Sequence, residues 1–227
     1  QNLSLYANYI EGLIKGETAP LSANGLPVTN GGQVFAPFAA KQKEIGAKYD
    51  GGNIGGSVAF FTTDQPSYFV QNQTFGPNGK QRNRGIELTV FGEPVRGLRV
   101  LGGLTLLDAE LRQTAGGLNE GNDAIGVPRR ALNIGVDYDV PGVRGLALNA
   151  RVVNTSKQYA DAANRLVVPD WTRVDIGARY TTKVSGKPVV LRANIENLFD
   201  KNYWLLSGTY ASVSAPRTLL LSATVDF

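Results

Sequence analysis

The chain has 227 residues, a formal net charge of +4 at pH 7, and neither cysteine nor histidine. Their absence excludes disulfides, thiolate or imidazole metal ligands, cysteine nucleophiles and serine–histidine triads within this chain. Hydrophobic residues make up 42% of the sequence, yet no stretch approaches the roughly 18 to 20 consecutive apolar residues of a membrane helix. The basic residues are spread along the chain, which argues against nucleic acid as a partner.

The sequence predicts about ten antiparallel β-strands of about ten residues, the length that a tilted membrane-spanning strand needs. In chain order, the expected strands are 2–13, 41–50, 54–63, 82–92, 97–112, 128–140, 145–156, 170–183, 188–203 and 215–227. Short turn signals recur about every 45 residues, at 50–53, 92–94, 141–143 and 184–188. Long loops rich in Gly, Asn and Ser fill the other connections, at 14–40, 64–81, 113–127, 157–169 and 204–215. Short turns therefore alternate with long loops, and both termini are expected on the side of the short turns.

Alternating apolar and polar residues give each strand one apolar and one polar face. Leu132, Ile134 and Val136 oppose Asn133 and Asp137, and two later strands repeat the pattern with arginine, aspartate and glutamate on the polar face. Long strands, alternating loop lengths and a charged face together indicate an all-β, antiparallel up-and-down meander from a transmembrane β-barrel with a wet lumen. A soluble β-sandwich shows the same alternation and is the alternative.

Two carboxylate pairs are the only candidates for acid–base chemistry or cation binding. Asp137 with Asp139, and Asp108 with Glu110, are two residues apart on strands, so each pair shares a face. A hydrated lumen wall is the favoured interpretation of both pairs. The glycine pairs do not open a helix after a strand, as a phosphate-binding loop must. We therefore expect no enzyme activity, no metal site and no other cofactor.

Basic residues at the expected strand ends are predicted to face lipid phosphates or an anionic ligand. These residues are Lys41, Lys43, Arg82, Arg84, Arg129 and Arg130.

Motifs near the carboxyl end resemble the last two strands of TonB-dependent siderophore receptors. They are Ile195–Tyr203 (I-E-N-L-F-D-K-N-Y), then Ala215–Arg217 (A-P-R) and the terminal Phe227. Further segments resemble other strands of the same family: Leu5–Tyr9, Lys43–Tyr49, Arg84–Leu88 and Val127–Asn133. The resemblance covers nearly the whole chain.

This resemblance implies a barrel of the 22-stranded class, plugged by an N-terminal domain. Such a barrel imports ferric siderophores across the bacterial outer membrane with energy passed through TonB. Residues 1–227 are expected to be the C-terminal part of the barrel, a fragment or processed piece without the plug, the N-terminal strands, the TonB-contacting region or a signal peptide. The alternatives are a TonB-dependent receptor for another cargo, such as a cobalamin, a sugar or haem, and a passive porin-like or surface-interaction barrel.

Aromatic residues and one arginine, in loops or at strand mouths, are the candidates for binding the ferric siderophore. They are Phe38, Tyr68, Phe69, Tyr159, Tyr203, Trp204, Tyr210 and Arg129. Aromatic rings suit flat, partly apolar chelates, and arginine suits their negative charge. The alternative for each residue is loop packing or a membrane-interface girdle.

Val225 and Phe227, at the end of the last strand, are expected to form the signal that the outer-membrane assembly machinery reads. Phe227 is also expected to anchor the strand in lipid. The remaining expected partners are TonB, through the missing N-terminal region, and the membrane's lipid and lipopolysaccharide.

Overall fold

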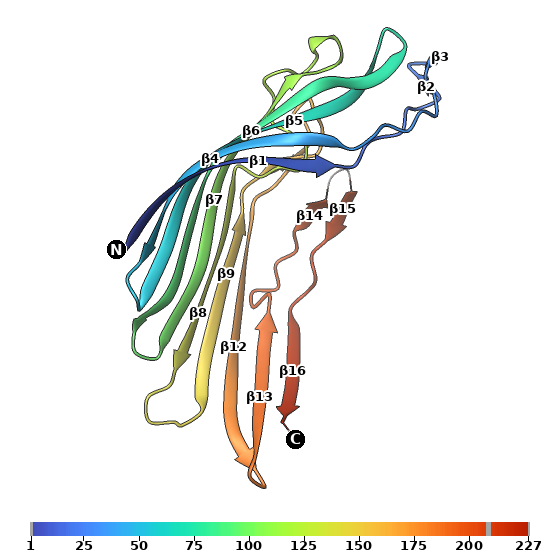
Figure 1. Ribbon diagram of the computed structural model, residues 1–227. Helices are drawn as coiled ribbons and strands as arrows, with labels where there is room; N and C mark the ends of the chain where they lie inside the picture. Colours follow the sequence, from blue (N-terminus) through green and yellow to red (C-terminus); the bar gives the residue numbers. More distant parts are fainter. Residues whose placement is uncertain (1, 208–209, 227) are drawn as a thin grey trace.

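A computed structural model describes residues 2–207 and 210–226 as one curved wall of antiparallel strands (Figure 1). Ten strands pair in the order β1-β4-β5-β6-β7-β8-β9-β12-β13-β16. They are β1 (Leu3–Ile14), β4 (Phe38–Asp50), β5 (Ile54–Gln71), β6 (Thr74–Val95), β7 (Leu98–Gln113), β8 (Arg130–Asp139), β9 (Leu146–Thr155), β12 (Trp171–Val184), β13 (Lys187–Glu196) and β16 (Thr218–Val225). Each pairs with the next long strand in the sequence, which confirms the predicted all-β meander.

Short hairpins and one helical turn occupy the long loops. They are β2 (Ser22–Ala23) with β3 (Leu26–Pro27), η1 (Ala115–Gly117), β10 (Gln158–Tyr159) with β11 (Val167–Val168), and β14 (Trp204–Ser207) with β15 (Tyr210–Val213). All the long loops leave the same end of the wall (Figure 1). Leu3 pairs with Tyr49, and Val225 pairs with Val189. The first strand therefore begins, and the last strand finishes, on the side of the short turns, as predicted.

Several predicted boundaries are wrong. The turn expected at 92–94 lies inside β6, which continues to Val95, and the chain turns at Arg96 and Gly97 instead. Most of the expected loop 64–81 is strand, because β5 and β6 continue past the sheet as a hairpin that turns at Asn72 and Gln73. A register shift between Ser67 and Phe69 lets the hairpin twist away from the wall. The expected strand 188–203 ends early, at Glu196, because the chain then takes a corner with positive φ at Asn197 and Asp200.

The apolar face of the wall has no protein layer against it. Ile45, Phe60, Leu219 and Leu221 are between 50% and 71% exposed on this face. Among the described residues, no large side chain is fully buried. A β-sandwich needs a packed layer between two sheets, so the exposed apolar face favours a wall that faces lipid. The described residues include no helix long and apolar enough to cross a membrane.

Candidate functional site

Two pairs of long loops are joined at their end of the wall. The first pair consists of the 15–37 loop and the β5–β6 hairpin. The backbone N–H of Thr29 donates to the Gln73 carbonyl at 2.8 Å, and the side chain of Asn30 exchanges two hydrogen bonds of 2.9 Å with the backbone of Phe75. Ala19, Val28 and Phe75 are buried between the two segments. The first loop therefore has its own small core.

Two of the predicted ligand-binding aromatics take part in this packing. The Tyr68 ring lies 5.2 Å from the Phe38 ring, 5.1 Å from the Phe35 ring and 5.5 Å from the Phe75 ring, measured between centroids. Such contacts are worth about 0.5–1.5 kcal/mol each beyond burial. Phe69 is half-buried on the same strand. The geometry thus favours loop packing for Phe38 and Tyr68.

The second loop pair joins residues 114–129 to residues 156–170. The Asp123 backbone N–H donates to Asn164 Oδ1 at 2.8 Å, and Asn164 Nδ2 donates back to the Asp123 carbonyl at 3.0 Å. Arg129 donates to both carboxylate oxygens of Asp123, and this bond raises the pKa of the guanidinium. The Gly126 N–H donates to the Tyr159 carbonyl at 2.9 Å. The structure therefore brings Arg129 and Tyr159 into one loop pair.

A third cluster lies where β12 begins, directly after a long loop. The rings of Trp171 and Tyr203 stack at 4.2 Å between centroids with an interplanar angle of 13°. Arg173 shares the polar face with Trp171, and its Nη2 donates to Asp175 at 2.9 Å while its buried Nε has no protein partner. Neither Trp171 nor Arg173 was among the predicted site residues. Period-two counting back from Asp175 would have placed both on the polar face at the strand mouth.

The stack is positioned by the corner that follows β13. Asn197 is 2% exposed, and its side chain bonds the backbone of Lys201 twice and the Ala215 carbonyl once, each at 3.0 Å. Asp200 accepts from the Arg217 N–H at 2.8 Å. The N-L-F-D-K and P-R motifs are therefore structural, because they tie the end of β13 to the start of β16.

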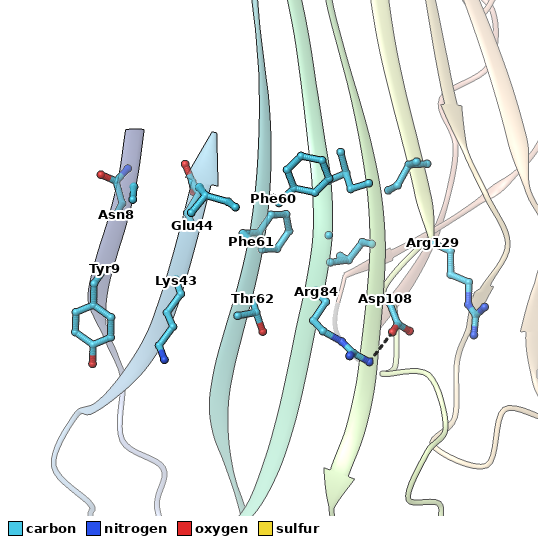
Figure 2. Close-up of a pocket in the computed structure, with 16 residues that line it drawn as sticks. Asn8, Tyr9, Lys43, Glu44, Phe60, Phe61, Thr62, Arg84, Asp108 and Arg129 are labelled. Atoms are coloured by element: carbon cyan, nitrogen blue, oxygen red, sulfur yellow. Dashed lines mark hydrogen bonds and ion pairs between the residues drawn. The ribbon is translucent and has the colours of Figure 1, made fainter. Parts of the chain in front are cut away.

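The third loop hairpin, β14–β15, carries the two remaining candidates. Trp204 is 51% exposed and Tyr210 is 81% exposed. The eight predicted residues thus fall into three groups, one per loop pair and one on this hairpin with its corner. Of the eight, only Arg129 borders a hollow of about 1040 Å³ on the wall (Figure 2).

Known proteins share this architecture. A family model described as "TonB dependent receptor-like, beta-barrel" matches residues 1–198. The chain belongs to the TonB-dependent receptor β-barrel family. The receptor barrels of this family are outer-membrane proteins, which gives the wall its lipid-facing and lumen-facing sides.

Several relatives of this receptor barrel cover the whole chain. The ferrichrome receptor FcuA of Yersinia enterocolitica is 46% identical over 232 residues, which is 100% of this chain and 31% of the relative. The crystal structure of BauA, the ferric preacinetobactin receptor of Acinetobacter baumannii, superposes with a TM-score of 0.88 at 42% identity, covering 100% of this chain and 34% of that one. The siderophore receptor PiuA of the same species gives a TM-score of 0.79 at 28% identity, with 98% and 33% coverage. The chain therefore spans about a third of the length of these relatives.

The lumen face of the receptor barrel carries ion pairs between neighbouring strands. Arg99 donates to Asp139 at 2.6 and 2.8 Å and also to Asp137, and Arg179 donates to Asp137 at 3.3 Å. Two carboxylates therefore meet two guanidinium groups, which explains this pair without acid–base chemistry. The described residues contain no cluster of three or more acidic side chains suited to a metal ion.

The other carboxylate pair was assigned to the wrong face. Asp108 and Glu110 share the face of Leu106, since Leu106 lies opposite Ile86 and Asp108 lies opposite Arg84. Asp108 and Glu110 therefore face outward, beyond the apolar part of β7, where Arg84 and Arg112 pair with them. The pair had been placed on the lumen face because both residues are charged. In the structure, these charged residues lie at the outer rim of the wall.

The final strand, β16, ends at Val225, before the predicted end at 227. Val225 pairs with Val189 and is 40% exposed on the outward face, while Phe227 lies outside the described residues.

Proposed function

We propose that this chain is the C-terminal part of the barrel of an outer-membrane receptor that takes up ferric siderophores. In this proposal the whole barrel belongs to the 22-stranded class, and an N-terminal plug outside this chain supplies the contact with TonB. The 46% identity to a ferrichrome receptor along the whole chain carries the proposal. The relatives bind different chelates, so the proposed cargo is ferric chelates as a class. In this proposal the protein acts as a transporter and not as an enzyme.

The strand mouth of β12 is the proposed contact point for the chelate. Trp171 and Tyr203 offer a flat, half-exposed aromatic surface, and Arg173 adds a positive charge on the same face. A ferric chelate combines partly apolar rings or chains with oxygen ligands of negative charge, which matches this set. Arg129 and Tyr159 in the second loop pair, and Trp204 and Tyr210 on the hairpin, are proposed as outer contacts.

Ligand binding to the complete receptor tests this function. Ferrichrome and a ferric catecholate are titrated separately, and binding is followed by quenching of tryptophan fluorescence. We expect saturable binding of one chelate, and about tenfold weaker binding after Trp171→Ala. Arg96→Ala, in a short turn at the opposite end of the wall, is the matched control and should bind normally.

Uptake of iron-55 separates the alternatives. In cells that lack TonB, bound chelate should remain at the surface while uptake is lost. Equal uptake with and without TonB would indicate a passive porin-like barrel. Saturable, TonB-dependent binding of a cobalamin, a sugar or haem in place of every ferric chelate would overturn the proposed cargo and leave the family assignment intact.

We also propose that the outer-membrane assembly machinery contacts Val225 and Phe227 at the end of the chain.

A further inference from the structure

The connections at the long-loop end of the wall carry no net charge. Four of them lie between long strands, at 15–37, 114–129, 156–170 and 197–217, and together they contain six basic and six acidic residues. The part of the β5–β6 hairpin that projects past the sheet, residues 65–79, contains no charged residue. The formal net charge of +4 therefore comes from the strands and the short turns.

Opposite charges are also balanced locally on the lumen side of this end. Arg129 Nη2 lies 2.7 Å from a carboxylate oxygen of Asp123, and Arg173 Nη2 lies 2.9 Å from one of Asp175. One step farther down the lumen face, Arg151 on β9 lies opposite Asp175, and β13 ends with Glu196. These last two side chains contribute one charge of each sign. A ligand that enters from the loops therefore meets single charges but no field of one sign.

The basic residues at the ends of the neighbouring strands do not alter this balance, because they lie on the outward face of the wall. Lys41 pairs there with Glu11 at 3.7 Å, and Lys80 and Arg82 pair with Asp64 at 3.0 and 2.7 Å. The wall separates these cations from the lumen.

Aromatic area takes the place of charge at the mouth. The Trp171–Tyr203 stack is half-buried, and Trp204 and Tyr210 on the β14–β15 hairpin are 51% and 81% exposed. An anion on such a surface would lose hydration without gaining a free cation in return, which is unfavourable. A surface of this kind also lacks the field that speeds the capture of charged ligands by roughly 10- to 1,000-fold. The mouth is therefore suited to a ligand without net charge.

Ferric chelates differ in this property. Three hydroxamates carry one negative charge each and balance Fe³⁺, so a ferric trihydroxamate has no net charge. Three catecholates carry two negative charges each, so a ferric tris-catecholate has a net charge of −3. The neutral chelate keeps its charges inside the coordination shell and presents largely apolar groups at its periphery.

We propose that this receptor selects ferric chelates of zero net charge, the trihydroxamate type, over anionic chelates of similar size. The inference rests on the proposed uptake of ferric chelates and narrows that cargo to one charge class. Arg173 donates to a coordinating oxygen of the bound chelate, and Asp175 keeps the binding surface neutral while it does so. Selectivity then comes from the absence of a free positive charge.

Titration of the complete receptor with two probes tests the proposal, with binding followed by quenching of tryptophan fluorescence. The probes are ferrichrome, as the ferric trihydroxamate, and a ferric tris-catecholate. We expect ferrichrome to bind at least about tenfold more tightly at physiological salt. Its affinity should change by less than about twofold between low and high ionic strength, because a neutral ligand is not screened.

Asp123→Asn separates the effect of charge from that of shape. The substitution removes one negative charge beside Arg129, while the backbone hydrogen bonds between residue 123 and Asn164 keep the loop pair joined. The tris-catecholate should bind about fivefold more tightly to this variant, and ferrichrome should bind as before. Asp50→Asn is the matched control, because it removes the same charge in a short turn at the opposite end of the wall. An asparagine there can still accept from the Gly52 N–H, and both chelates should bind this variant as they bind the wild type.

Tighter or equal binding of the tris-catecholate by the wild type would overturn the charge selectivity and leave the proposed uptake of ferric chelates standing. Equal affinities of Asp123→Asn and wild type for the tris-catecholate would show that shape, and not charge, separates the two probes. Absence of saturable binding for both ferric chelates would instead overturn the proposed function itself.

Discussion

Asp175 on β12 accepts a hydrogen bond of 2.9 Å from the backbone N–H of Asn197, the first residue of the corner after β13. Asp175 also pairs with Arg173, so one carboxylate links the charge at the strand mouth to the corner that carries Tyr203. The N-L-F-D-K motif thus holds the corner that supports the proposed binding surface.

Asn197→Ala should destabilise this corner by roughly 2–4 kcal/mol. The substitution removes three hydrogen bonds of a side chain that is 2% exposed, two with the backbone of Lys201 and one with the Ala215 carbonyl. Urea unfolding of the complete barrel measures the loss. Asn202→Ala, at an exposed position of the same segment, is the control and should change stability by less than about 0.5 kcal/mol. Equal stability of the two variants would contradict a structural role for the motif.

Val136→Arg should destabilise the barrel by roughly 2–4 kcal/mol, because Val136 faces the hydrocarbon of the membrane. Asn149→Arg, on the lumen face of the adjacent strand β9, is the matched change and should cost much less. Refolding into lipid vesicles at increasing urea concentrations provides both values. A similar cost on the two faces would refute the inside–outside assignment.

Period-two alternation was sufficient to predict the ten strands, because each residue of a membrane strand faces either lipid or lumen. The alternation failed for 64–81, where Pro66, Gly76 and Pro77 indicated a loop. A hairpin that projects beyond the sheet has free edges, and these edges tolerate proline and glycine. The sequence could not predict which candidate residues lie next to one another. The Trp171–Tyr203 stack joins residues 32 positions apart, and only the corner at Asn197 brings them together.

Asn30→Ala should free the 15–37 loop from the β5–β6 hairpin. Both hydrogen bonds between the Asn30 side chain and Phe75 are lost, which costs roughly 1–3 kcal/mol of loop stability. Amide hydrogen exchange at residues 28–35 should then accelerate by about tenfold or more, while the strands of the main sheet keep their protection. Ser22→Ala, at an exposed position of the same loop, should leave exchange unchanged. Unchanged exchange in Asn30→Ala would show that the aromatic packing and the Thr29–Gln73 hydrogen bond hold the loop without Asn30.

Gly142→Ala and Gly145→Ala should differ although both glycines have φ of +81° in the same short turn. A Cβ at Gly142 meets nothing within 4 Å. This variant is therefore destabilised only by the left-handed backbone strain, about 1 kcal/mol. A Cβ at Gly145 would lie 2.0 Å from the Thr181 carbonyl oxygen on β12. Because the Thr181 N–H donates to the Gly145 carbonyl at 2.8 Å, relief of this clash must move the strand pair and adds roughly 1–3 kcal/mol. Unfolding curves of the two variants measure the difference, and equal midpoints would mean that the turn lies farther from β12 than the structure shows.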